Sequence, residues 1–125
     1  MRLLLDTNVL LRMLEEPHRL SADVQAALDD LANTLVVTTA SLVEISIKVG
    51  TGRMVMPPRL LERLSEFDCD ILPVKAEHAM RMADLPVIHR DPFDRLIVAQ
   101  AMSEDLILLT TDRLLEAYGC AVMRA

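Results

Sequence analysis

Four acidic residues stand at matching places beside the predicted strands. Asp6 ends the first aliphatic run of the chain, and Asp112 follows the fourth. Glu44 lies one turn into the helix after the second run, and Asp94 lies in the first turn of the helix that leads into the fourth. Open α/β sheets bind ligands at the carboxyl ends of their strands. We therefore expect the four carboxylates to meet at one end of a sheet.

Carboxylates gathered in this way need a proton or a cation between them. If the strands that carry Asp6 and Asp112 are neighbours, their backbones lie ~5 Å apart. Two unit charges 4 Å apart repel by about 4 kcal/mol at an effective dielectric constant near 20. An all-oxygen ligand set without paired histidine or cysteine favours Mg²⁺ or Mn²⁺ over zinc.

Each acid also has a purely structural interpretation. Asp6 and Asp112 are equally suited to cap the helices that follow them. Glu44 has Lys48 one turn later, an ordinary surface pair on a helix, although its immediate neighbours are aliphatic. An inert binding module, in which these acids are only caps, is therefore an alternative to a metal enzyme.

The segment from Asp91 to Arg95 combines a helix start with a candidate site residue. Asp91 followed by proline is typical of an N-cap and first helical residue, so we assign Asp91 mainly to capping and to support of the site. Asp94 leads into the buried face of the helix, and we assign it to the site. Arg95 and Arg113 follow two of the acids directly and are candidates for phosphate contacts or simple surface charges.

Strands alternate with helices along the whole chain, which predicts an α/β domain with a parallel sheet. Strands are expected over residues 3–5, 35–38, 70–74, 106–109 and 121–123. Helices are expected over 9–14, from 21, over 40–49, from the proline pair 57–58, and over 75–85, 92–103 and 112–118. The length of 125 residues suits one domain over residues 1–125.

Composition limits the function classes. The net charge of −6 argues against a protein that holds nucleic acid by overall positive charge. All thirteen basic residues except Lys48 and Lys75 are arginines, which suit phosphate contacts. No apolar run approaches a membrane span, and Cys69 and Cys120 lack metal-type spacing. We expect a cytoplasmic protein with two unpaired cysteines.

The sequence resembles PIN-domain proteins, and closely resembles VapC-type toxins of prokaryotic toxin–antitoxin pairs. Four motifs in the family's order carry the resemblance: Leu5-Asp6-Thr7-Asn8-Val9-Leu10, Ser41-Leu42-Val43-Glu44-Ile45, His89-Arg90-Asp91-Pro92-Phe93-Asp94-Arg95 with Ala99-Gln100-Ala101, and Leu109-Thr110-Thr111-Asp112. Relatives of this subtype often carry histidine at the place of Asn8 and tryptophan at the places of Arg12 and Val43.

The resemblance implies a single three-layer α/β/α domain and Mg²⁺- or Mn²⁺-dependent cleavage of RNA. Asp6, Glu44, Asp94 and Asp112 would hold the metal and carry the catalysis, with hydrogen-bonding support from Asn8 and Thr111. It further implies a cognate antitoxin as partner and a homodimer. We expect the strand order 3-2-1-4-5, which places Cys69 and Cys120 at opposite edges of the sheet. Apolar residues on several helices, which include Met13, Leu14, Leu60, Leu64, Met80 and Met82, are expected to leave interface surface.

Two phosphate-handling folds are alternatives of similar size. A receiver domain needs adjacent acids after its first strand, an aspartate after its third and a late lysine, whereas Asp6 stands alone and no lysine follows Lys75. A phosphatase of the haloacid dehalogenase type needs a second acid at the place of Asn8.

Overall fold

Five parallel strands form the centre of the computed structural model, which describes residues 1–125. The strands are β1 (Arg2–Leu5), β2 (Thr34–Thr38), β3 (Asp70–Leu72), β4 (Ile107–Thr110) and β5 (Val122–Arg124). Their order is β3-β2-β1-β4-β5, as predicted. Leu5 at the end of β1 pairs with Val37 of β2 and with Leu109 of β4, so the residues that follow these strands lie at one edge of the sheet.

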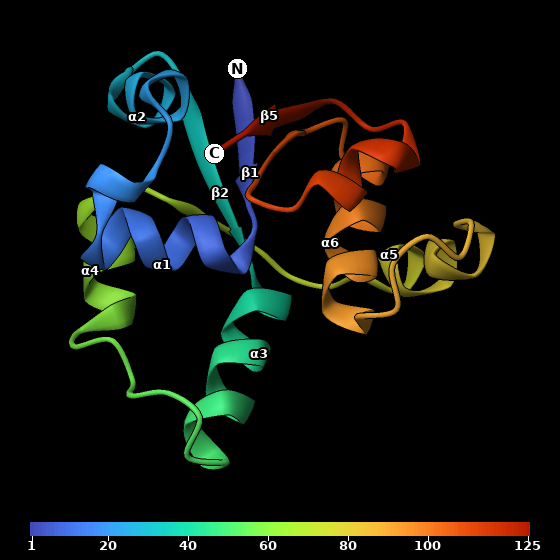
Figure 1. The fold of residues 1–125 in the computed structure, drawn as a ribbon, viewed down its shortest axis with the longest axis horizontal. Helices are drawn as coiled ribbons and strands as arrows, with labels where there is room; N and C mark the ends of the chain where they lie inside the picture. The colour runs from blue at the N-terminus through green and yellow to red at the C-terminus, as the bar shows by residue number, and fades with distance from the viewer.

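Helices cover both faces of the sheet, which gives three layers (Figure 1). On one side lie α1 (Thr7–Glu15), the short 3-10 helix η1 (Pro17–Arg19), α2 (Ala22–Asp29) and α4 (Leu60–Glu66). On the other side lie α5 (Ala76–Arg81), the 3-10 helix η2 (Met82–Asp84), α6 (Pro92–Ser103) and the 3-10 helix η3 (Arg113–Tyr118). Helix α3 (Thr39–Gly50) leaves the carboxyl end of β2 and extends beyond the sheet.

Alternating side chains of the strands supply two separate cores. Leu3 and Leu5 of β1 pack into the core beneath α1, α2 and α4, whereas Leu4 packs into the core beneath α6 and η3. All three are fully buried, as expected of a central parallel strand covered on both faces. The buried strand that precedes Asp6 therefore holds that residue at the centre of the sheet edge.

Several boundaries differ from the predicted ones for local reasons. The fourth helix begins at Leu60, not at the proline pair, because Arg59 has a left-handed φ of 54° that helical backbone cannot include. Strand β3 ends at Leu72, so Pro73 lies outside the ladder that it cannot join. The helix predicted over 75–85 divides into α5 and η2, and the one predicted over 112–118 is the 3-10 helix η3.

Other predicted surface features lie elsewhere than expected. Met13, Leu14 and Leu64 are at most 5% exposed and belong to the core beneath α1, because they lie on the helix faces turned toward the sheet.

Cys69 and Cys120 are both free thiols, as predicted. None of the helices has the length and apolar character that a membrane span requires.

Candidate functional site

A polar cavity of about 130 Å³ lies at the carboxyl end of the sheet and brings the four acids together. No hydrophobic residue lines it. Its walls are Asp6, Thr7, Asn8, Glu44, Lys48, Asp91, Asp94 and Asp112. We call this space the acid cavity. It contains every acid that the sequence assigned to a site; Asp6 and Asp112 follow β1 and β4, and Glu44 and Asp94 lie in α3 and α6.

Asp6 both caps a helix and faces the acid cavity. Its Oδ1 accepts the backbone N–H of Val9 at 2.7 Å, which makes Asp6 the N-cap of α1. Its Oδ2 accepts the hydroxyl of Thr110, and the backbone N–H of Thr111 also points to the carboxylate. Asp6 is only 4% exposed. Burial raises the pKa of this carboxyl above its usual value, and the hydrogen bonds oppose that rise only in part.

Glu44 is held by two partners of different chemistry. Its Oε1 lies 2.7 Å from the Thr7 hydroxyl, which in turn lies 2.9 Å from the Ser41 hydroxyl. Its Oε2 pairs with the Lys48 ammonium at 2.9 Å. The helical pair foreseen in the sequence therefore exists, but Glu44 itself is 8% exposed and lines the acid cavity. It is a buried site residue as well as a member of an ion pair.

His89 joins the remaining two acids, a role that the sequence did not reveal. Its Nε2 lies 2.9 Å from Oδ2 of Asp112 and 3.3 Å from Oδ2 of Asp94. Its Nδ1 accepts the backbone N–H of Asp91 at 3.0 Å. Since a neutral imidazole carries one proton, this bond assigns the proton to Nε2, which donates it toward the two carboxylates. The backbone N–H of His89 is anchored to the Tyr118 hydroxyl at 2.8 Å.

Asp94 has a carboxyl with a strongly raised pKa. Burial raises its pKa to about 7, the charge of Asp91 adds to the rise, and His89 opposes it. Asp91 is the N-cap of α6, since its Oδ1 accepts the backbone N–H of Phe93 at 2.8 Å. Asp94 makes no capping bond, and its one polar side-chain contact is His89. Asp94 therefore serves the helix only through its charge in the first turn, and not as a cap.

The donors at the acid cavity fit a hard divalent cation. Asp6, Glu44, Asp94 and Asp112 offer carboxylate oxygens, the ligands that Mg²⁺ and Mn²⁺ prefer. His89 lies close enough to Asp94 and Asp112 for a shared metal site. Its Nε2 carries the proton, however, so that nitrogen has no free lone pair for a metal. The side chains that then remain available to a cation are carboxylates.

The supporting residues differ in detail from those named at the sequence level. Thr110, the last residue of β4, supplies the hydroxyl bond to Asp6, and Thr111, which follows the strand, supplies a backbone N–H. Asn8 lines the acid cavity but its side chain makes no hydrogen bond within the protein. Thr7 rather than Asn8 supports Glu44.

The two candidate RNA-contacting arginines differ. The Arg95 guanidinium donates to the carbonyls of Met82, Leu85 and Pro86, so it ties down the loop before α6 and has little capacity left for a phosphate. This placement favours the structural interpretation of Arg95. Arg113 is exposed and has no partner within the protein.

Comparison with known proteins gives the family. A model of the PIN domain matches residues 3–119. The chain belongs to the PIN domain family. Among curated proteins, none matches this sequence.

Solved structures share the PIN fold over nearly the whole chain. One chain of VapBC2 from Rickettsia felis, bound to a DNA fragment from the promoter, superposes with a TM-score of 0.72 at 15% identity, covering 99% of this chain and 98% of that one. A chain of DNA-bound VapBC from Salmonella typhimurium has a TM-score of 0.71 at 18% identity, with coverage of 99% and 98%. A chain of VapBC-5 from Mycobacterium tuberculosis, a toxin–antitoxin system, has a TM-score of 0.59 at 24% identity, with coverage of 98% and 96%.

Proposed function

We propose that this PIN domain is a metal-dependent endoribonuclease that hydrolyses RNA phosphodiesters. The observation that carries the proposal is the convergence of four carboxylates from separate elements on one cavity without hydrophobic walls. Helix capping accounts for Asp6, Asp91 and Asp112, but not for Asp94 or for the buried Glu44.

Asp6, Glu44, Asp94 and Asp112 would hold Mg²⁺ or Mn²⁺. When bound, such a cation offsets the carboxylate charge, polarises a phosphate and makes water more acidic. The protein contributes rigid placement: Val9 and Thr110 fix both oxygens of Asp6.

In the metal-free protein, burial and the charge of Asp91 raise the pKa of Asp94 to about 7. A bound cation would lower this pKa again, so Asp94 would be ionised as a metal ligand. His89 donates its Nε2 proton toward Asp94 and Asp112, and its ring is held by Asp91 and Tyr118. We therefore assign His89 to positioning of these two carboxylates.

The biological setting that we propose is a type II toxin–antitoxin pair, with this protein as the toxin. The similar structures come from VapBC complexes, which supports a cognate antitoxin as partner. The proposal includes a homodimer, an RNA substrate and a cytoplasmic location, with which the two free thiols are compatible.

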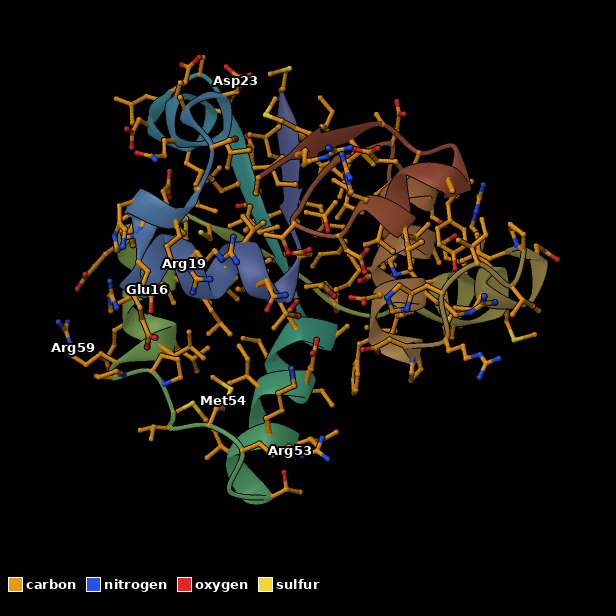
Figure 2. The ribbon with its side chains drawn as sticks, viewed as in Figure 1. Glu16, Arg19, Asp23, Arg53, Met54 and Arg59 are labelled. Carbon is orange, nitrogen blue, oxygen red and sulfur yellow. The ribbon has the colours of Figure 1, made fainter.

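Cleavage assays with matched variants test the nuclease. Purified protein should cut structured RNA in Mg²⁺ or Mn²⁺ and not in EDTA. Asp94→Asn and Asp6→Asn should each abolish cleavage. Asp23→Asn is the matched control, because this exposed acid of α2 undergoes the same chemical change away from the acid cavity (Figure 2). Equal cleavage by wild-type protein and Asp94→Asn would show a contaminating nuclease and refute the proposal.

A further inference from the structure

A second, larger cavity adjoins the acid cavity. It measures about 420 Å³, which lies in the range of small-ligand sites. It shares Glu44, Lys48 and Asp91 with the acid cavity, so the two spaces have a common wall. The other residues that line it are Ile47, Arg53, Arg90, Pro92 and Phe93. We call it the arginine pocket.

The two arginines of this pocket have no partner in the protein. Neither Arg53 nor Arg90 forms an ion pair or a side-chain hydrogen bond, and both are exposed. Figure 2 shows Arg53 at the far end of α3. Most other arginines are engaged: Arg19, Arg59 and Arg124 pair with glutamates, and Arg12, Arg63 and Arg95 bond backbone carbonyls. In a chain of net charge −6, two free guanidinium groups thus flank the acidic centre.

The pocket also offers an apolar surface. Phe93, the second residue of α6, belongs to neither hydrophobic core and faces this space, although aromatic side chains are normally packed inside. Ile47 of α3 is 50% exposed on the same pocket. An aromatic face beside free guanidinium groups is the combination that binds single-stranded nucleotides, through base stacking and phosphate contacts.

Lys48 stands between the two cavities. Its ammonium lies 2.9 Å from Oε2 of Glu44, and its side chain lines both spaces. A strand that runs from one cavity to the other therefore passes a third cation at the common wall.

On the basis of the ribonuclease function proposed above, we propose that the arginine pocket binds the RNA nucleotide that flanks the cleaved phosphate. Arg53 and Arg90 contact the backbone phosphate of this nucleotide, and Phe93 stacks on its base. The acid cavity, at about 130 Å³, holds the reacting phosphate, and the larger pocket receives the neighbouring unit of the strand.

Fluorescence anisotropy with a fluorescein-labelled RNA of twelve nucleotides of mixed sequence tests this assignment. Titrations in Ca²⁺ over a range of salt concentrations, with the probe checked for integrity on a gel, give affinity and its salt dependence. The Arg53→Ala/Arg90→Ala variant should bind about tenfold more weakly, and its log–log salt slope should fall by about 0.7, because both arginines contact the same phosphate. Phe93→Leu, which keeps an apolar side chain, should bind about tenfold more weakly with an unchanged slope.

The matched control is Arg2→Ala/Arg81→Ala. These two arginines are also exposed and unpaired but line neither cavity, so affinity and slope should stay those of the wild type. The melting temperature of the Arg53→Ala/Arg90→Ala protein should equal that of the wild type, because the removed side chains have no partners.

Two contrary results have different meanings. In the first, the wild type cleaves RNA and Asp94→Asn does not, but Arg53→Ala/Arg90→Ala binds the probe as tightly as the Arg2→Ala/Arg81→Ala control. The assignment of the arginine pocket is then wrong, and the proposed nuclease function is still supported. If the wild type neither binds nor cleaves RNA, the proposed function is wrong and the pocket assignment falls with it.

Discussion

Replacement of Asp94 by asparagine should make the metal-free protein more stable. The amide keeps the shape of the side chain and removes its charge. Since α6 is capped by Asp91 and the only polar side-chain contact of Asp94 is His89, the change costs no capping bond. The main effect is therefore the loss of one buried negative charge from the acid cavity.

The size of the effect follows from the raised pKa of Asp94. Burial and the charge of Asp91 raise this pKa from 3.8 to about 7. Because a tenfold change in proton affinity is worth about 1.4 kcal/mol, ionised Asp94 lowers the free energy of unfolding by as much as about 4 kcal/mol. Local relaxation and access of water reduce this figure, so we expect a gain of about 2–4 kcal/mol for Asp94→Asn at pH 8.

The pH dependence of this gain has a definite sign. The folded protein holds the Asp94 proton more tightly than the unfolded chain, so wild-type stability falls as pH rises from about 4 to about 7 and then levels off. The difference between Asp94→Asn and the wild type should thus be near zero at pH 4 and largest at pH 8. At about 4 °C per kcal/mol for a domain of this size, the melting temperature should rise by about 10 °C at pH 8.

Thermal melts by circular dichroism in EDTA, at pH 4 and pH 8, provide the measurement. Mg²⁺ should then stabilise the wild type by about 2.7 kcal/mol at a hundredfold excess over its dissociation constant, and Asp94→Asn much less. Asp23→Asn, a loss of negative charge in the first turn of α2, should be neutral or slightly destabilising at both pH values. If Asp94→Asn melts below the wild type at pH 8 and Mg²⁺ stabilises neither, Asp94 acts only on the helix dipole and the metal centre does not exist.

Three further outcomes can be checked. Thr110→Val removes the hydroxyl that bonds buried Asp6 and should lower the free energy of unfolding in urea by about 1–3 kcal/mol; an unchanged midpoint would contradict the importance of this bond. Glu104 has a lowered pKa because it accepts a hydrogen bond from His78 and, with a smaller effect, one from Lys75. In urea denaturation the wild type should therefore be more stable than Glu104→Gln above pH 5, and this difference should disappear as pH falls below about 4. Burial raises the pKa of the Cys69 thiol to about 11, so iodoacetamide at pH 8 should alkylate it much more slowly than it alkylates the amino acid cysteine in solution. Equal rates would show that the Cys69 thiol is accessible to solvent and readily ionised.

Local patterns in the sequence determined the elements and the acids that follow them. The aliphatic run before Asp6 predicts a buried strand, and Asp91 followed by Pro92 predicts the start of a helix; the structure has both. Alternation of strands and helices gives parallel strands, whose carboxyl ends share one edge. The placement of Asp6 and Asp112 at that edge was therefore predictable from short segments of sequence, whereas their proximity depended on the pairing of β1 with β4.

Only the tertiary structure decided the partners of those acids. Thr110 meets Asp6 across 104 positions of the chain, and His89 reaches Asp112 across 23. The Arg95 guanidinium donates to backbone carbonyls of the loop before α6, and this contact depends on how that loop packs against the helix. Strand ends and helix starts follow from backbone sterics and from hydrogen bonds within a few residues, which the sequence displays directly. Contacts between distant side chains depend instead on how the layers pack, because a displacement of about 1 Å makes or breaks a hydrogen bond.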